Sequence, residues 1–331
     1  MSFIATPKRL RGLGFLGINQ RNADFIMRYN PRKLYPLVDN KLRTKQLALV
    51  QGIAVPELYG VVEAQYQTKT IIEILGQHQD FVIKPAHGSG GNGILVITGC
   101  MGDYFQKANG ELLSLNNIRH HISNILSGMY SLSGVVDQAI IEYRVKFDPV
   151  FEEISYRGVP DIRVIVFRGV PVTAMVRLPT RQSDGKANLH QGAMGMGVDL
   201  RTGVSCGGVF RNQACVIHPD TGKAITGIAI PHWNDILQLA TRCADTVKLG
   251  YLGVDIVVDR YLGPLMLELN ARPGLSVQLA NQRGLLDNLQ AIEALKFIPE
   301  DVNARVALSQ QLSSQHPNAG NVENPASVET P

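Results

Sequence analysis

The sequence predicts an α+β fold of one or two compact units, and three observations support this prediction. Short β-branched runs flank a glycine cluster between residues 81 and 97. A second glycine-containing turn joins two strand-like runs between residues 253 and 270. Apolar residues at helical spacing mark an amphipathic helix at 231–250. Strands that occur in hairpins, with helices elsewhere in the chain, are typical of α+β proteins.

The composition is that of an ordinary globular protein. The chain has 331 residues, of which 45% are apolar and 18% charged, so it is long enough to bury a substantial core. The net charge is +4, and the lysines and arginines are spread along the chain rather than gathered in one block. A nucleic-acid partner is therefore not indicated.

Cysteine usage and the lack of a long apolar run predict a cytoplasmic protein. The cysteines have no C-x-x-C spacing, so we expect reduced thiols rather than a zinc site. They are Cys100, Cys206, Cys215 and Cys243. Residues 1–11 lack the apolar core of a secretory signal, and no stretch approaches the roughly 18 apolar residues that span a bilayer.

The elements follow in order from an N-terminal arm. Residues 1–38 show no sustained period and predict a set of loops laid on the body. Residues 40–50 have apolar residues at helical spacing behind an Asp-Asn cap, which predicts a helix. Strands are expected at 81–84, 94–97, 135–143, 162–168 and 171–178. The amphipathic helix at 231–250 follows, and the polar composition of 300–331 predicts a disordered tail.

The pattern G-x-G-x-x-G occurs twice, at 12–17 and at 88–93. The first copy lacks a preceding strand, so we interpret it as an ordinary loop. The second copy has strands on both sides, which argues against a dinucleotide-binding turn, and it lacks the G-K-[ST] ending of a Walker loop. A glycine hairpin of this kind can fold over a triphosphate, with Lys84 placing a cation on the phosphates. The alternative is a mobile surface hairpin.

The strand-like runs 253–259 and 264–270 predict a second hairpin. A turn centred between residues 261 and 262 sets Asp255 opposite Glu268, so that both project on the same side as Asn270. Two carboxylates and an amide oxygen form the kind of oxygen cluster that Mg²⁺ takes together with phosphates. The alternative is that Asp255 points outward and is solvated. Arg272 follows these residues, either as a cation beside the metal or as a surface arginine.

These motifs, taken in order, resemble one known superfamily over residues 39–293. The motifs are Asp39-Asn40-Lys41-Leu42-Arg43-Thr44, Val82-Ile83-Lys84 through Gly93, Ile141-Glu142-Tyr143, Asp161-Ile162-Arg163, Asn188-Leu189-His190-Gln191-Gly192, Gly253-Val254-Asp255-Ile256 and Glu268-Leu269-Asn270-Ala271-Arg272-Pro273-Gly274. The chain resembles the ATP-grasp superfamily, most closely the alpha-L-glutamate ligase-like branch related to the ribosomal-protein glutamate ligases. The resemblance implies an ATP-grasp fold, in which two α+β lobes grip ATP between them. The smaller lobe would span 39–142 and carry the glycine-rich loop, and the larger lobe would span 143–299 and carry the metal site.

The resemblance also implies roles for individual residues. Lys41 and Lys84 would contact phosphates, under a loop formed by His87, Gly88, Ser89, Gly90, Gly91 and Gly93. The nucleotide would further meet Glu142 and Tyr143 at the adenine, Asp161 near the ribose, and Lys186 and Asn188. The magnesium ligands would be Asp255, Glu268 and Asn270. Arg177 and Arg272 would be catalytic, steadying the transferred phosphoryl group and the acyl phosphate.

The activity implied is that of an ATP-dependent carboxylate–amine ligase. One or two Mg²⁺ ions, with Mn²⁺ as a substitute, would accompany ATP, and the amide would form through an acyl phosphate. The substrates would be a carboxylate and an amine, such as glutamate or another amino acid and the end of a peptide or protein. A homo-oligomer is left open.

Two alternatives remain at this stage. One is a catalytically silent ATP-binding protein that regulates a partner, and the other is a ligase with a different amine acceptor. His87 and His190 have two readings each, as a base or as a loop or substrate contact. The segment 146–160 is longer than the link that usually joins the adenine strand to the Asp161 position in this superfamily. The resemblance implies no role for it.

Overall fold

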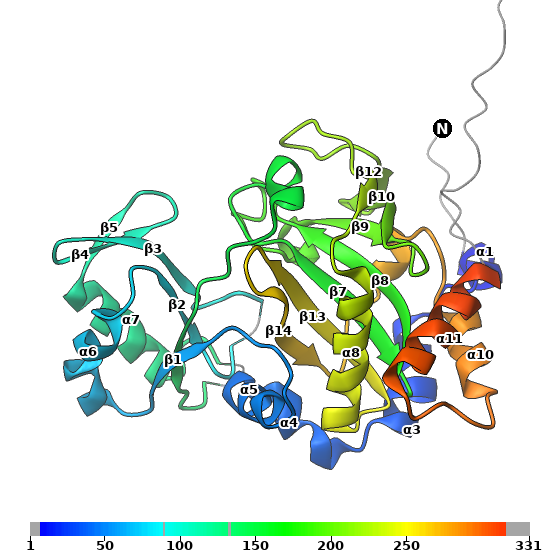
Figure 1. Ribbon diagram of the computed structural model, residues 1–331, viewed down its shortest axis with the longest axis horizontal. Coiled ribbons are helices and arrows are strands. Elements are labelled where there is room, and N and C mark those ends of the chain that lie inside the picture. Colours follow the sequence, from blue (N-terminus) through cyan, green and yellow to red (C-terminus); the bar gives the residue numbers. More distant parts are fainter. Residues whose placement is uncertain (1–6, 89, 132–133, 316–331) are drawn as a thin grey trace, which may run out of the picture.

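Figure 1 shows the computed structural model, which describes residues 7–88, 90–131 and 134–315. Two sheets form separate lobes. The smaller lobe holds six strands in the order β1-β6-β2-β3-β4-β5, and the larger lobe holds eight, in the order β11-β10-β9-β8-β7-β13-β14 with β12 paired to β10. Neighbouring strands are antiparallel in both sheets. The predicted α+β class is confirmed.

The smaller lobe packs its sheet against two helices. Its strands are β1 (Leu58–Val62), β2 (Phe81–Pro85), β3 (Leu95–Met101), β4 (Tyr104–Lys107), β5 (Leu112–Ser114) and β6 (Ala139–Glu142), and its helical segments are η3 (Gln65–Lys69), α6 (Ile71–Leu75) and α7 (Leu115–Leu126). Ile118, Ile122 and Ile125 recur at helical spacing on α7 and are fully buried. They meet Phe81 and Ile83, which alternate on one face of β2.

The larger lobe buries both faces of its sheet. Its strands are β7 (Asp161–Phe167), β8 (Val170–Leu178), β9 (Met194–Val198), β10 (Val204–Phe210), β11 (Gln213–Cys215), β12 (Thr226–Ala229), β13 (Tyr251–Asp259) and β14 (Gly263–Asn270). The helical segments are η4 (Pro149–Ile154), η5 (Leu189–Gln191), α8 (Trp233–Val247), α9 (Ser276–Ala280), α10 (Leu286–Glu293) and α11 (Val302–Gln315). On β7, Val164 and Val166 face the core beneath α8, whereas Ile165 and Phe167 face the core formed with α9, α10 and the N-terminal arm.

Most predicted elements lie where the sequence placed them. Helix α5 (Lys41–Val50) begins at Asn40, whose side chain accepts a hydrogen bond from the backbone N–H of Arg43. The strands flanking the glycine loop and the partner strands β7 and β8 are confirmed. The strand expected at 135–143 is shorter, since pairing covers only β6. Helix α5 also serves both lobes, because Leu42 packs on the small lobe and Ala48 on the core beneath α8.

The N-terminal arm is helical, so the expectation of loops at 1–38 was wrong for the described part. The arm forms α1 (Pro7–Gly12), α2 (Ile18–Gln20), the π-helix η1 (Arg21–Ile26), α3 (Met27–Tyr29), η2 (Arg32–Leu34) and α4 (Pro36–Asp39). Phe25 is buried, edge-on to Phe167 with ring centroids 5.4 Å apart. A π-helical turn breaks the 3.6-residue period, so the apolar residues gave no helical pattern in the sequence.

The C-terminal segment was expected to be a disordered tail from residue 300, and this was wrong for 302–315. Helix α11 packs against α8 and β8. Arg305 makes a bidentate ion pair with Asp245 on α8, with contacts of 2.7 and 2.5 Å, and Val306 is buried. The helix lacks a continuous apolar stripe, which is why its composition suggested disorder. Residues 316–331 lie outside the described residues. No helix in the described part is long and apolar enough to cross a membrane.

Candidate active site

The glycine-rich loop between β2 and β3 has a backbone that only glycine adopts without strain. Gly90, Gly91 and Gly93 have φ values of 64°, 79° and 75°, in the left-handed region. Space also excludes side chains, because a Cβ atom at Gly88 would lie 2.2 Å from Cγ of Pro85 and one at Gly93 would lie 2.6 Å from the Tyr130 ring. Ser89 lies outside the described residues.

This loop touches the larger lobe at residues 186–191. Gln191 donates a hydrogen bond from Nε2 to the carbonyl of Gly90, at 3.1 Å. A Cβ atom at Gly90 would lie 3.5 Å from Asn188 Nδ2, and one at Gly91 would lie 3.5 Å from Lys186 Cδ. The structure therefore brings the predicted Lys186 and Asn188 to the loop. Gln191 was given no role from the sequence, although it belongs to the motif that carried Asn188.

Lys41 connects the loop to the hairpin of the larger lobe. It is the first residue of α5, and its ammonium group donates to the carbonyl of Gly88 at 2.5 Å. The same Nζ lies 3.6 Å from a carboxylate oxygen of Glu268 on β14. The ammonium group of Lys41 therefore contacts both the glycine loop of the smaller lobe and the β13–β14 hairpin of the larger lobe.

A buried triad of two lysines and one carboxylate lies on the small lobe. Lys45 and Lys84 both pair with Glu142, Lys45 at 2.5 Å, and all three residues are buried. Burial lowers the pKa of Lys45 from 10.5 to about 8. Burial opposes ionisation of Glu142, but Lys84 and Lys45 lower its pKa overall. With both lysines protonated, the triad carries one positive charge in excess.

Lys45 was missed by the sequence analysis, although a signal was present. It lies four residues after Lys41 on α5 and therefore on the same helical face. Glu142 was expected at the adenine, partly through its backbone. Its side chain instead pairs with Lys45 and Lys84. Any contact of this residue with the adenine would therefore come from its backbone.

The hairpin β13–β14 has the predicted register, with Asp255 opposite Glu268. Asp255 lies between two guanidinium groups that the sequence analysis did not place beside it. Arg163 contacts both of its oxygens at 2.7 and 2.6 Å, and Arg177 contacts one at 2.6 Å. Burial opposes ionisation, but Arg163 and Arg177 hold the pKa of Asp255 at about 2. Asp255 is buried, so the alternative of an outward, solvated side chain was wrong.

Asp161 completes this cluster. Both of its oxygens accept from Arg177, each at 2.5 Å. Asp161 is therefore oriented by Arg177, and its predicted contact with the ribose stays a prediction. The four side chains of the cluster, Asp161, Arg163, Arg177 and Asp255, sum to zero charge. Arg177 lies inside the cluster and holds Asp255 rather than pointing to open space.

The remaining hairpin residues are more accessible. The Glu268 side chain is 37% exposed. Oδ1 of Asn270 accepts from the backbone N–H of Arg272 at 2.8 Å, and the Arg272 guanidinium stacks over Tyr35, 5.0 Å from the ring centroid. Within the described ranges, no three His, Cys, Asp or Glu side chains gather as a metal cluster. A hard cation here would draw on two carboxylates, one amide oxygen and oxygens of a bound phosphate, which fits Mg²⁺.

Comparison with known proteins identifies the family. Residues 20–294 match the family described as sugar-transfer associated ATP-grasp. The chain belongs to this ATP-grasp family.

Curated relatives agree with this assignment. A probable alpha-L-glutamate ligase of Maridesulfovibrio salexigens is 26% identical over 236 residues, which is 71% of this chain and 56% of the relative. A ribosomal protein bS6–L-glutamate ligase of Escherichia fergusonii is 24% identical over 237 residues, with the same coverage of each chain. This chain therefore spans little more than half the length of the curated relatives it matches.

A solved structure supports the fold. The biotin carboxylase of Campylobacter jejuni, solved with a β,γ-ATP compound, superposes with a TM-score of 0.53 at 13% identity. The superposition covers 91% of this chain and 55% of that one. The predicted ATP-grasp fold is confirmed.

The side chains of Tyr143 and His87, two further predicted residues of this ATP-grasp chain, form hydrogen bonds with neighbouring residues. The Tyr143 hydroxyl donates to Asp259 at the end of β13, at 3.1 Å. His87 Nδ1 lies 2.8 Å from the buried Asp137, and its Nε2 lies 3.1 Å from Asn40 Nδ2. Since Nδ1 then donates to the carboxylate, Nε2 accepts from Asn40, which makes His87 a brace between α5 and the glycine loop.

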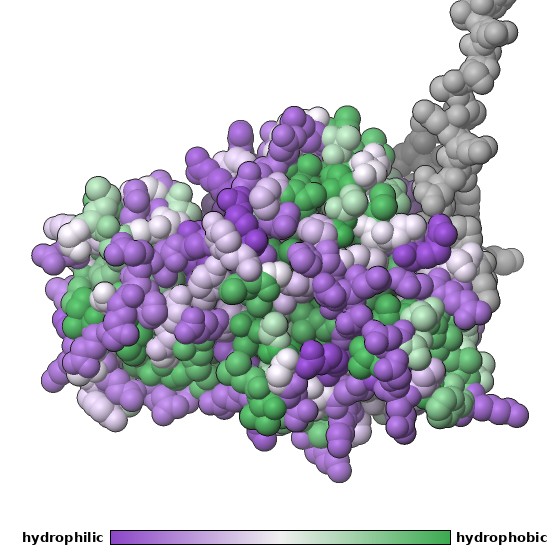
Figure 2. Space-filling model, viewed as in Figure 1, coloured by the Kyte–Doolittle hydropathy of each residue, from purple (hydrophilic) through white to green (hydrophobic). Residues whose placement is uncertain are grey.

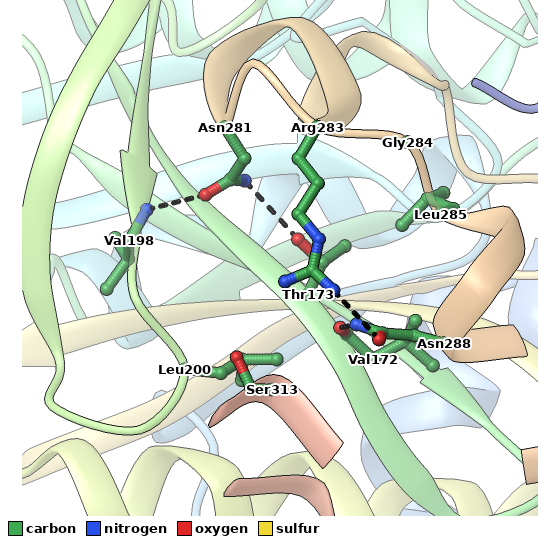
Figure 3. A pocket seen from close by; sticks show the side chains of 10 residues that line it. All are labelled: Val172, Thr173, Val198, Leu200, Asn281, Arg283, Gly284, Leu285, Asn288 and Ser313. Carbon is green, nitrogen blue, oxygen red and sulfur yellow. Dashed lines mark hydrogen bonds between the residues drawn. The ribbon is translucent and has the colours of Figure 1, made fainter. Parts of the chain in front are cut away.

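A pocket of the larger lobe lies near the start of β8 and contains none of the predicted site residues. It is lined by Val172, Thr173, Val198, Leu200, Asn281, Arg283, Gly284, Leu285, Asn288 and Ser313 (Figure 3). Its polar groups bond to one another, as Arg283 donates to Asn288 and Asn288 donates to the carbonyl of Val172. These bonds fix the α9–α10 segment to the early residues of β8, whereas Arg177 lies near the end of that strand.

Proposed function

We propose that this chain is an ATP-dependent carboxylate–amine ligase that forms an amide bond through an acyl phosphate. The observation that carries the proposal is the meeting of three predicted parts at one place. Lys186 and Asn188 lie beside the glycine loop, and Lys41 on α5 connects the carbonyl of Gly88 to Glu268. A nucleotide triphosphate would lie between the lobes at this junction.

The phosphates would find positive charge from three lysines. Lys41 lies under the glycine loop, and the triad of Lys45, Lys84 and Glu142 has one cation in excess of its carboxylate. Backbone N–H groups of a glycine-rich loop add donors without side-chain bulk. We therefore propose from the excess positive charge of the triad that Lys84 contacts the phosphates, and that Lys45 adds to this charge.

Asp255, Glu268 and Asn270 would hold Mg²⁺, or Mn²⁺ as a substitute, together with phosphate oxygens. The ion would neutralise charge on the phosphates during transfer. Arg163 and Arg177 keep Asp255 ionised and oriented for this task. Arg177 is therefore proposed as a positioning residue. Arg272 would leave its stack on Tyr35 if it acts on the acyl phosphate.

The reaction would proceed in two steps. A substrate carboxylate oxygen attacks the γ-phosphorus, the bond to the bridging oxygen breaks, and ADP leaves. The amine nitrogen then attacks the acyl carbon, phosphate leaves, and the amine proton passes to phosphate or water. Gln191 and the glycine loop would keep water from the acyl phosphate while it exists.

The names of the curated relatives suggest glutamate or another amino acid as one substrate, and a peptide or protein end as the other. One observation favours a second candidate, a silent ATP-binding regulator. Asp255 is already satisfied by two guanidinium groups, as a residue of a purely structural cluster would be. The spacing of the cysteines, with no C-x-x-C pair, is the reason to propose a cytoplasmic location.

The test is a screen for ADP release by the purified protein with Mg-ATP. Amino acids and short peptides would be supplied as pairs, and products would be weighed by mass spectrometry. A ligase gives ADP together with a product heavier by one residue. Tight ATP binding with no ADP release from any pair would favour the regulator instead.

A further inference from the structure

The long link before β7 forms one wall of a platform beside the proposed active site. The link contains η4, then Tyr156 and Arg157, and it enters β7 at Asp161. The segment 179–186 leaves β8 after Leu178. Because Asp161 pairs with Arg177 across β7 and β8, both segments leave the sheet at the end that carries the Asp255 cluster.

The two segments are fixed to each other by backbone contacts. Tyr156 N–H donates to the carbonyl of Pro179 at 3.2 Å. Gly158 approaches so closely that a Cβ atom there would lie 1.8 Å from the carbonyl oxygen of Gly185. The backbone N–H of Arg181 donates to Asp220 at 2.7 Å. Side chains carried by these segments are therefore held in place before any ligand arrives.

Two guanidinium groups flank the Tyr156 ring. Arg157 lies 5.4 Å and Arg181 5.5 Å from the ring centroid. Arg157 is also one of the few non-glycine residues with positive φ, at 55°. Such backbone strain clusters at sites where the surrounding structure requires a particular side-chain direction. Stacking on the ring orders each planar guanidinium and leaves its N–H groups for other partners.

The acidic side chains of this region are paired elsewhere. Glu152 pairs with Arg260 and Glu153 with Lys223. The carboxylates that stay close are Asp184, which is exposed, and Asp220, which accepts from the backbone of Arg181. Among the described residues, no ion pair involves the cations Arg157, Arg181, Lys186 or Arg211. We call these four residues the cationic rim.

The rim is continuous with the glycine loop. Lys186 lies beside Gly91, and Arg211 donates from Nε to Gln182 in the same segment as Arg181, at 2.7 Å. Figure 2 shows strongly hydrophilic side chains gathered at the top of the larger lobe, where it meets the smaller one. Cations along the mouth of a site raise the local concentration of anionic ligands.

We propose that the cationic rim binds an oxyanion group of the substrate, a carboxylate or a phosphate, outside the reacting centre. This inference rests on the proposed function and names its substrate class as anionic. Arg157 and Arg181 supply planar N–H pairs that suit two-point contact with either group. Lys186 and Arg211 add charge on the two sides.

The test uses labelled tetraglutamate as the carboxylate probe and glucose 1-phosphate as the phosphate probe. The neutral control is labelled tetraglutamine with an acetylated N-terminus and an amidated C-terminus. Binding is measured with saturating Mg-ADP, so that the nucleotide lysines are occupied. The test variant is Arg157→Gln with Arg181→Gln. The matched control is Arg201→Gln, an exposed arginine at the opposite end of the β9–β10 hairpin.

We expect at least one anionic probe to bind the wild type, and the double variant to weaken it by about tenfold, since each exposed charge contributes a few-fold. Arg201→Gln should stay within about twofold. The stronger probe then assigns carboxylate or phosphate. Equal binding of tetraglutamate and tetraglutamine without phosphate binding, or equal affinity in the double variant, would overturn the rim. ADP affinity is measured separately for each protein. A wild-type protein that does not bind ADP would count against the proposed ATP site rather than against the rim.

Discussion

Two buried carboxylates, one in each lobe, are each held between two cations, yet the clusters differ in charge. Glu142 of the small lobe pairs with two lysines and leaves one positive charge in excess. Asp255 of the larger lobe pairs with Arg163 and Arg177, and Arg177 also pairs with Asp161. The small-lobe cluster can therefore attract a phosphate through its excess positive charge. The large-lobe cluster is neutral, and it can only provide the ionised Asp255 as a ligand for a metal ion.

The type of cation fits this division. Lysine carries a compact charge on a flexible stem, and its pKa responds to burial, as that of Lys45 does. Arginine stays charged and holds a carboxylate in a fixed two-point geometry, as Arg163 holds Asp255. The small-lobe cluster is suited to adjust to a ligand, and the large-lobe cluster is suited to hold its shape.

The largest effect is expected from breaking the large-lobe cluster. Asp255→Asn removes the carboxylate that Arg163 and Arg177 share and leaves excess positive charge in the core. We expect the free energy of unfolding to fall by about 3 kcal/mol or more, measured by urea denaturation. Asp235→Asn, at an exposed position on α8, is the control. An unchanged midpoint for Asp255→Asn would show that the arginines find other partners.

The small-lobe cluster should respond mainly in nucleotide affinity. Lys45→Met leaves Glu142 and Lys84 as a neutral pair, so the excess charge is lost. We expect ATP to bind about tenfold more weakly, measured by calorimetry, because a charged hydrogen-bonding partner near phosphate is removed. Lys69→Met, an exposed lysine of the same lobe, should bind ATP normally. Normal affinity in Lys45→Met would separate the triad from the nucleotide.

The pH dependence of ATP binding should reveal the same charge. The pKa of Lys45 is lowered to about 8, so the triad loses its excess charge as pH rises through 8. ATP affinity should fall over that range in the wild type, and Lys45→Met should show no such step. Protein stability should change with pH in the opposite direction to ATP affinity. Between about pH 8 and pH 10.5, Lys45 keeps its proton in the unfolded chain but has lost it in the folded chain. The free energy of unfolding should therefore rise with pH over this range.

The smallest effect is expected at the contact between the lobes. Gln191→Ala removes one neutral hydrogen bond to Gly90. We expect the KM for ATP to rise a few-fold with little change in kcat, since a bond of this kind contributes roughly 1 kcal/mol. Gln311→Ala, at an exposed glutamine on α11, is the control. A large loss of kcat would instead place Gln191 in the chemical step.

The sequence predicted the local parts of the site because their geometry follows from short-range rules. A two-residue period and a glycine-containing turn were enough to set Asp255 opposite Glu268. Strands on both sides of the glycine cluster were enough to reject a dinucleotide turn. Gly90, Gly91 and Gly93, which have positive φ, lie in the predicted loop.

The parts that the sequence did not reveal depend on which strands become neighbours. Arg163 and Arg177 lie 92 and 78 residues before Asp255, and they meet it only because β7 pairs with both β8 and β13. No pattern along the chain states that order. Lys45 meets Glu142 for the same reason, through packing of α5 under the small sheet. The helical arm was hidden by its π-helical turn.

The most direct test of the account is ADP release by Glu268→Ala. Glu268 lies opposite Asp255 and within 3.6 Å of Lys41, and it is the accessible carboxylate of the proposed metal site. With the substrate pair found by the ADP-release screen, we expect Glu268→Ala to lose nearly all ATP turnover while remaining folded. Glu73→Ala, an exposed carboxylate on α6, should keep full turnover. Near-normal ADP release by folded Glu268→Ala would contradict the assignment of the metal site and with it the proposed mechanism.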